Sequence, residues 1–182
     1  MELRLAHCTL RPWRRGDEAS LVRHANNRNV SRNLRDRFPY PYTAADADAW
    51  ISSMVGQAPP TSLAIEVQGE VVGGIGLQLG TDVQRRSAEI GYWLAEPFWG
   101  RGIATEALRA MTAYAFEQFD LVRLEAGVFS WNPASGRVLE KCGYVLEGRA
   151  RAAVVKDGRT GDRLLYGLIR AGAIQGSRAG AA

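Results

Sequence analysis

The chain has 182 residues, enough for one domain with a sizeable core. Hydrophobic residues make up 46% of the sequence and charged residues 23%, and the formal net charge is +4, which is ordinary for a globular protein in water. The sequence has no long apolar run and no secretory signal pattern, so we expect no membrane span. The two cysteines (Cys8 and Cys142) and the two histidines form no cluster, so we expect no disulfide scaffold and no metal site, and a cytoplasmic location.

Positive charge is concentrated near the start of the chain. Residues 1–37 contain nine arginines against four acidic residues, whereas the remainder is close to neutral. Such a patch can bind nucleic acid or an acidic partner, but more often it is a solvated surface. We favour the solvated surface and keep RNA contact as the alternative.

The first part of the chain alternates strand and helix signals. Leucines before Pro12 predict an opening strand, and early acidic residues in residues 16–27 predict a helix that stops at two asparagines. Two prolines exclude a helix over residues 38–43. Thr43, with Asp46 three residues later, predicts a capped helix that runs to about residue 54.

The middle of the chain predicts strands around one long helix. Two apolar runs on either side of Gly69 predict a hairpin, and alternation over residues 87–95 predicts a third strand. An apolar stripe predicts a helix from Ile103 to about Phe119, followed by a strand over residues 121–129. This strand–helix–strand order is typical of a parallel crossover.

The last part predicts one more helix and two strands. Asn132 followed by Pro133 is a typical helix start, and the helix is expected to end at Gly143. Residues 144–169 predict two strands joined at residues 156–158. The predicted fold class is α/β, with one mixed sheet of about seven strands flanked by about four helices. We expect one domain over residues 1–170 and a flexible tail over residues 171–182.

Two glycines stand between the strand predicted at residues 87–95 and the helix that begins near Ile103. In a helix or strand interior, glycine costs about 0.5–1 kcal/mol relative to alanine, so Gly100 and Gly102 indicate a backbone requirement. The first amides of a helix lack internal partners and lie at its positive end, so glycines beside them allow a diphosphate to approach. The spacing fits neither the dinucleotide pattern nor the P-loop pattern, and a tight turn is the alternative.

Four segments together resemble the GNAT superfamily of acyl-CoA-dependent N-acetyltransferases, in particular its RimJ/RimL group. They are LRPWRRGDEASL, PYPYTAADADAWI, AEIGYWLAEPFWGRGIATEAL and NPASGRVLEKCGYVLEGRAR, which together extend over nearly the whole chain. The resemblance implies the GNAT fold, with acetyl-CoA as the donor and a primary amine as the acceptor.

The resemblance also implies where coenzyme A is held. The family pattern Gln/Arg-x-x-Gly-x-Gly/Ala falls on residues 99–104, with Trp99 in place of the first polar residue. Backbone groups of Trp93, Leu94 and Ala95 are expected to contact the pantetheine and acetyl group, and Asn132 is expected to contact the cofactor as well as cap its helix. The residues implied for the diphosphate are Trp99, Gly100, Arg101, Gly102, Ile103, Ala104 and Thr105.

Two residues are implied for the chemistry, which needs a neutral amine and a proton for the leaving thiolate. Many relatives supply that proton from a tyrosine, but Leu139 stands there, and Ser135 matches the serine of RimL-like members instead. The glutamate of a later strand in RimL-like sequences is replaced by Val154, which leaves Glu89 as the candidate base. The alternatives are structural: Ser135 bonded to helix amides, and Glu89 paired with an arginine.

Weak base machinery favours an acceptor that is easily deprotonated. At pH 7 an α-amine with a pKa near 7.8 costs about 1 kcal/mol to deprotonate, whereas a lysine with a pKa near 10.4 costs about 4.6 kcal/mol. We therefore expect a protein N-terminal α-amine, of the ribosomal-protein type. By family analogy the acceptor lies near Asn33, Tyr40 and Tyr42, with Trp50 nearby, although these aromatic residues are alternatively core.

Other functions fit the same sequence. The fold could serve a small-molecule amine or a longer acyl-CoA. An RNA-binding or CoA-sensing module without catalysis is the alternative from another class. Contact with ribosomal protein or RNA through the basic N-terminal region, and a homodimer, are further expectations.

Overall fold

The computed structural model describes residues 2–173, so most of the tail predicted at residues 171–182 lies outside the described residues. Within residues 2–173 the chain forms one eight-stranded sheet and five α-helices, which confirms the predicted mixed α/β class with one strand and one helix more than expected. The domain boundary near residue 170 stays a prediction. In this described part, each helix is too short or too polar to cross a lipid bilayer.

The elements follow the chain in this order. The strands are β1 (Leu3–Arg4), β2 (Thr9–Pro12), β3 (Ser62–Val67), β4 (Glu70–Leu79), β5 (Ser87–Leu94), β6 (Arg123–Phe129), β7 (Val145–Lys156) and β8 (Arg159–Ile169). The helices are α1 (Glu18–Ala25), α2 (Arg28–Ser31), α3 (Ala44–Met54), α4 (Ile103–Gln118) and α5 (Pro133–Lys141), with short 3₁₀ turns at Asp82–Gln84 and Glu96–Phe98.

Local signals explain most of these boundaries. The predicted capping box is present, because the Thr43 side chain accepts from the Asp46 N–H and the Asp46 side chain accepts from the Thr43 N–H. The additional helix α2 is a single turn, and it begins at Asn27, whose side chain accepts from the N–H groups of Asn29 and Val30. The additional strand arises because the opening strand divides into β1 and β2, which pair as a hairpin.

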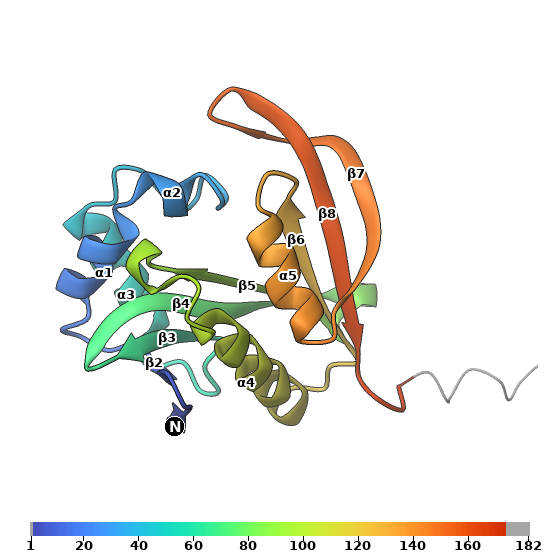
Figure 1. The fold of residues 1–182 in the computed structure, drawn as a ribbon. Coiled ribbons are helices and arrows are strands. Elements are labelled where there is room, and N and C mark those ends of the chain that lie inside the picture. Colours follow the sequence, from blue (N-terminus) through green and yellow to red (C-terminus); the bar gives the residue numbers. More distant parts are fainter. Residues whose placement is uncertain (1, 174–182) are drawn as a thin grey trace, which may run out of the picture.

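Helices cover both faces of the sheet (Figure 1). The core on one face joins α4 and α5 to alternate strand residues such as Leu63 and Ile65. The core on the other face joins α1 and α3 to residues that point the opposite way, such as Ala64 and Val71. This alternation is the period of two expected of a sheet buried on both sides.

The strand order places one parallel pair in an otherwise antiparallel sheet. The order is β1-β2-β3-β4-β5-β6-β8-β7, and only β5 and β6 are parallel, as the predicted crossover requires. The β7–β8 hairpin rises beyond the rest of the sheet and curves (Figure 1), with register shifts between Leu146 and Gly148 and between Ala150 and Val154.

Candidate functional site

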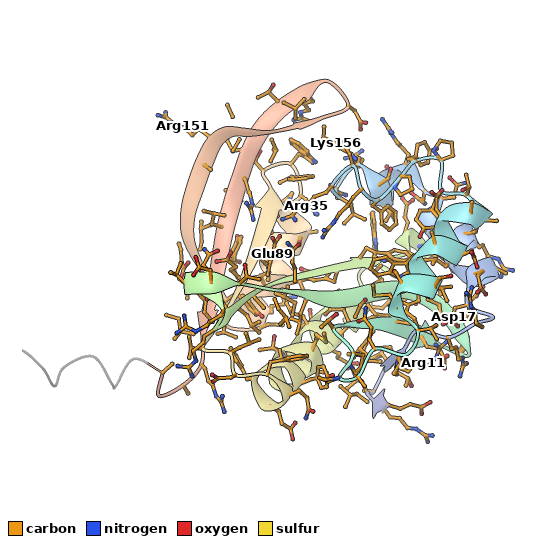
Figure 2. The ribbon with its side chains drawn as sticks, turned by 180° about the vertical axis from the view of Figure 1, so that it is seen from behind. Arg11, Asp17, Arg35, Glu89, Arg151 and Lys156 are labelled. Carbon is orange, nitrogen blue, oxygen red and sulfur yellow. The ribbon has the colours of Figure 1, made fainter. Side chains whose placement is uncertain are left out.

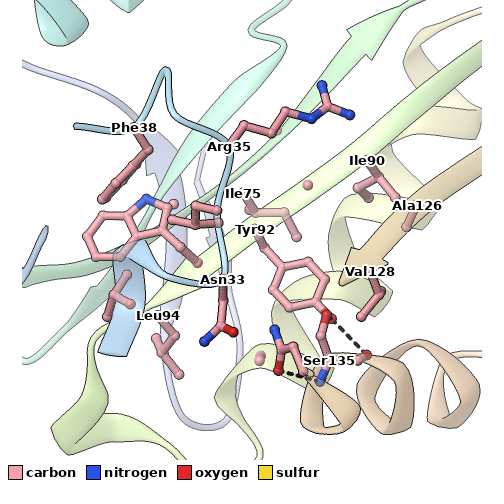
Figure 3. A pocket seen from close by; sticks show the side chains of 18 of the residues that line it. Asn33, Arg35, Phe38, Ile75, Ile90, Tyr92, Leu94, Ala126, Val128 and Ser135 are labelled. Atoms are coloured by element: carbon pink, nitrogen blue, oxygen red, sulfur yellow. Dashed lines mark hydrogen bonds between the residues drawn. The ribbon is translucent and has the colours of Figure 1, made fainter. Parts of the chain in front are cut away.

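A cavity of about 1440 Å³ opens where β5 and β6 separate. The two strands pair only from Ser87 to Glu89, although β5 continues beside β4 to Leu94 and β6 continues beside β8 to Phe129. Helix α5 and the start of α4 line one part of the cavity, and residues 33–39 line another (Figure 3). The divergence therefore creates a cavity in the middle of the sheet.

The start of α4 presents free backbone donors to this cavity. Gly100 and Gly102 have φ angles of +76° and +83°, which explains why both positions are glycine. No side chain caps the helix, and within the described residues the N–H groups of residues 100–105 donate to no protein acceptor. A Cβ added at either glycine would meet no protein atom within 4 Å, so the space beside both glycines is open. The arrangement suits an anion.

The end of β5 is fixed by pairing with β4 on one side only. The Ala95 N–H donates to the Val72 carbonyl at 2.7 Å, and the Ala95 carbonyl accepts from the Phe98 N–H at 3.0 Å. Backbone groups alternate along a strand, so the Trp93 N–H faces β4 and the Leu94 N–H faces the gap toward β6. Leu94 is thus the residue with a backbone donor on the cavity side.

Trp99 ties the glycine loop to the end of this strand. Its indole Nε1–H donates to the Leu94 carbonyl at 2.7 Å. The tryptophan thereby connects the loop to the last residue of β5. Beside it, the Arg101 guanidinium lies 5.3 Å from the centre of the Phe98 ring, where it adds positive charge to the same end of the cavity.

Tyr92 and Ser135 form a hydroxyl pair on the cavity wall (Figure 3). Their oxygens are 2.9 Å apart, and the Tyr92 hydroxyl also lies 3.2 Å from the Ser135 carbonyl oxygen. Burial raises the pKa of Tyr92 well above its ordinary value, so the phenol keeps its proton at neutral pH. The Ser135 hydroxyl is therefore bonded to Tyr92, whereas the predicted alternative had it bonded to helix amides. The Ser135 N–H is bound by the Asn132 side chain at 3.4 Å, as expected of a helix cap.

Glu89 lies on the opposite face of β5 from Tyr92 and lines the cavity. Its Oε1 accepts from Arg35 Nη2 and lies 3.7 Å from Arg163 Nη2, and Figure 2 shows Arg35 directed toward Glu89. The predicted pairing of Glu89 with an arginine is confirmed. Within the described residues, the second carboxylate oxygen has no hydrogen-bond partner and remains available to a water or a substrate.

The residues expected around the acceptor divide into two groups. Asn33, Tyr42 and Trp50 line the cavity, and Tyr42 is also part of the buried core. Tyr40 does not line it, because its exposed ring lies under the Arg28 guanidinium at 5.1 Å. An acceptor contact of Tyr40 stays a prediction.

Comparisons with known proteins agree with this geometry. The sequence profile of the acetyltransferase (GNAT) domain matches residues 7–145. The chain belongs to this family. A GNAT relative from Bacillus licheniformis, the uncharacterized N-acetyltransferase p20, is 33% identical over 65% of this chain and 66% of its own length. The ribosomal-protein-serine acetyltransferase of Escherichia coli is 34% identical over 46% of this chain and 47% of its own length.

Solved structures extend the likeness to nearly the whole chain. The structure of RimL, a ribosomal L7/L12 α-N-protein acetyltransferase in complex with coenzyme A, has a TM-score of 0.80 and covers 93% of this chain and 98% of its own, at 22% identity. The GNAT fold is thus shared throughout, although the chain spans only about half to two thirds of the length of the two curated relatives named above.

The structure brings most of the residues implied by the GNAT resemblance into one cavity. Those that line it are Asn33, Tyr42, Glu89, Trp93, Leu94, Trp99, Gly100, Arg101, Gly102, Ile103, Ala104, Thr105, Asn132 and Ser135. Ala95 is the exception on the cofactor side, because its backbone donor and acceptor are both occupied within the protein. Trp93 also lines the cavity, and its side chain packs against Phe38 with 5.5 Å between the ring centres.

Tyr92 and Arg35 are two polar residues of the cavity that the sequence alone did not single out. Tyr92 lies on the same face of β5 as Ala88 and Ile90, so its position favours a core residue. A tyrosine hydroxyl that is removed from water needs a hydrogen-bond partner, and this need was the sequence signal for a polar neighbour. Arg35 stands among nine arginines near the start of the chain, and no local pattern distinguishes it from the others.

Proposed function

We propose that this protein is an acetyl-CoA-dependent N-acetyltransferase that acts on the α-amino group at the N-terminus of a protein. The observation that carries the proposal is the start of α4, whose unpartnered amides open into the same cavity as the free Leu94 N–H. Membership of the GNAT family supports acetyl transfer, and the ribosomal-protein acetyltransferases among the relatives support a protein acceptor.

The residues present fit coenzyme A. Open space lies beside Gly100 and Gly102, and Arg101 and Lys141 add positive charge to the cavity. These groups would hold the diphosphate, and the gap beyond Leu94 would receive the pantetheine arm. Acetyl-CoA, when bound, supplies the thioester and its leaving thiolate.

The chain's own groups are placed to assist the transfer. The Leu94 N–H points into the gap, where it can donate to an acyl oxygen. The Ser135 hydroxyl can donate its proton to the leaving thiolate and be reprotonated by the proton that the acceptor amine gives up, while Tyr92 Oη, 2.9 Å away, keeps its own proton and holds the serine hydroxyl in place. On the other face of β5, the free oxygen of Glu89 can accept an amine proton through a water.

The choice of acceptor depends on the free energy needed to deprotonate its amine. At pH 7, deprotonating an α-amine costs about 1 kcal/mol and deprotonating a lysine about 4.6 kcal/mol. Val154 lines the cavity where RimL-like sequences have a glutamate, so the site has one carboxylate fewer to meet that cost. An α-amine suits such a site better than a lysine does.

The test is a mass measurement. The protein is incubated with acetyl-CoA and peptides that offer either a free α-amine or, with the N-terminus blocked, a single lysine; a polyamine and an aminoglycoside complete the set. The α-amine peptides should each gain one acetyl group, at a rate at least about tenfold above the lysine peptides at pH 7.

The other outcomes select the alternatives. Acetylation of the small amines alone would assign the protein to small-molecule acetylation. Coenzyme A binding without thiol release, whichever amine is present, would make the protein a cofactor-binding module without catalysis.

A further inference from the structure

A glycine on the neighbouring strand β6 leaves room for the side chain of Arg163 on β8. Its guanidinium lies over Gly127 of β6, where an added Cβ would come within 2.3 Å of Nε and 2.7 Å of Nη2. The φ angle of Gly127 is not in the left-handed region, and glycine is unfavourable within a strand. The glycine is therefore explained by the close approach of the guanidinium, which it allows to reach the cavity.

The guanidinium of Arg163 is short of acceptors. Its nearest carboxylate oxygen, Glu89 Oε1, is 3.7 Å from Nη2, and that oxygen already accepts from Arg35. No hydrogen bond from Arg163 to a described residue is present, although its side chain is only 33% exposed. Two guanidinium groups thus share one carboxylate oxygen, which leaves a net positive charge beside Glu89.

The other charged residues of the cavity do not supply the missing acceptor. Asp36 is paired with Lys156 at 2.7 Å, and Asp46 accepts from the N–H and hydroxyl of Thr43. Arg37 adds a further cation, whose contact is the Gln78 side-chain oxygen at 3.4 Å. Arg101 and Lys141 bring positive charge to the α4 end. The positive charge at Arg163 and Arg35 is left for a ligand to balance.

We infer that Arg163 and Arg35 form a subsite for an anionic oxygen group, a carboxylate or a phosphate, on the acceptor. The inference rests on the proposed function, because it places the reacting amine near Glu89. Arg163 lies within 3.7 Å of Glu89, so the anionic group must stand within one or two residues of that amine. The preferred acceptors are therefore N-termini with an acidic or phosphorylated residue close behind, and cationic amines such as polyamines are disfavoured.

A set of matched peptides tests this preference. They begin with alanine and differ only in the second residue, which is aspartate, phosphoserine, asparagine or lysine. The kcat/KM ratio of the aspartate or phosphoserine peptide to the asparagine peptide should be about tenfold or more, with the lysine peptide lowest. The larger of the two anionic ratios tells whether the site prefers a carboxylate or a phosphate.

Three variants locate the subsite. Arg163→Gln removes the charge, and Gly127→Ala displaces the guanidinium with its charge retained; in both, the acidic-to-neutral ratio should fall toward one. Because the ratio is taken within each variant, an effect on the chemistry near Glu89 cancels. Arg86→Gln is the control, since Arg86 pairs with Asp120 outside the cavity, and it should keep the wild-type ratio.

A binding measurement with unreactive peptides tests the subsite independently of the proposed acetylation. The same peptides with an acetylated N-terminus, which cannot react, are titrated calorimetrically in the presence of coenzyme A. The wild-type protein should bind the acidic peptides about tenfold more tightly than the asparagine peptide, and Arg163→Gln should abolish the difference, even if no peptide is acetylated. Equal binding of the acidic and neutral peptides, or a preference for lysine, would overturn the subsite.

Discussion

At the scale of single residues, the hydroxyl pair of Tyr92 and Ser135 links two segments that are far apart in the sequence. Tyr92 stands on β5 and Ser135 in the first turn of α5, and the bond between them crosses the edge of the cavity. Burial raises the pKa of Tyr92, so its phenol stays protonated and can hold the Ser135 hydroxyl by a hydrogen bond, and under the proposed function the serine donates its own proton. This property matches the need of a leaving thiolate.

Variants of this pair test the proposed proton transfer. In Ser135→Ala, kcat should fall about a hundredfold with little change in the KM for acetyl-CoA, because general acid catalysis contributes about 10²–10⁴ in rate. Tyr92→Phe should give a smaller loss, and the double variant should be no worse than Ser135→Ala if the two act as one unit. Thiol release measured at saturating acceptor gives these values.

The matched control is Tyr144→Phe. The Tyr144 hydroxyl bonds to Thr112 on α4 and takes no part in lining the cavity. This variant should keep the wild-type kcat. Additive losses in the Tyr92/Ser135 double variant would show that the two hydroxyls act separately.

At this scale the sequence predicted residue types better than their partners. The pattern of Asn132 and Pro133 led to Ser135 in the first turn of a helix, because helix starts have local signals. The hydrogen bonds between polar side chains of the cavity join residues 43 or 54 positions apart, as in Tyr92–Ser135 and Arg35–Glu89. Such pairs depend on the tertiary fold, and no local pattern specifies them.

At the scale of elements, the turn before α4 is determined mainly by local interactions. The left-handed backbone at Gly102 orients the first turn of the helix, and Trp99 anchors the turn to the end of β5. Both effects belong to a stretch of ten residues, so the strand, the glycines and the helix start could be predicted together. The pairing of Ala95 with Val72 could not, since it depends on the register of β4 against β5.

Gly102→Ala tests the role of this turn in cofactor binding. The added methyl group would enter the open space beside the first turn of α4, and the left-handed backbone would also be strained. We expect coenzyme A affinity to fall at least about tenfold, as measured by titration calorimetry, together with a loss of stability of about 1–2 kcal/mol.

The control for the strain is Gly69→Ala, in the turn between β3 and β4. Gly69 has a φ angle of +82°, close to the +83° of Gly102, and an added Cβ there also meets no atom within 4 Å. This variant should lose similar stability and keep the wild-type affinity for coenzyme A. If both variants bound coenzyme A as the wild-type protein does, the α4 amides would not be its site.

At the scale of the whole molecule, the basic start of the chain is largely neutralised by later segments. Within residues 2–173, seven of the nine N-terminal arginines have a carboxylate within 4 Å, which the sequence could not show because many of the partners lie far along the chain. Examples are Arg23 with Glu70 and Arg28 with Asp157 at the tip of the β7–β8 hairpin. Less charge is thus free for a nucleic acid than the composition of residues 1–37 implied.

The distribution of buried tyrosines predicts how the stability of the whole fold responds to alkaline pH. Burial raises the pKa of Tyr42 and of Tyr144 to about 12, and it raises that of Tyr92 as well. Well below pH 10 these phenols are protonated in both the folded and the unfolded chain, so they add no pH dependence. Between about pH 10 and 12 the unfolded chain loses protons that the folded chain keeps, so the free energy of unfolding falls as pH rises, by at most about 1.4 kcal/mol per pH unit for each tyrosine. Urea unfolding at pH 9, 10 and 11 should show this slope, and Tyr144→Phe should make it shallower. A slope that stays the same in Tyr144→Phe would mean that other groups cause the alkaline loss of stability.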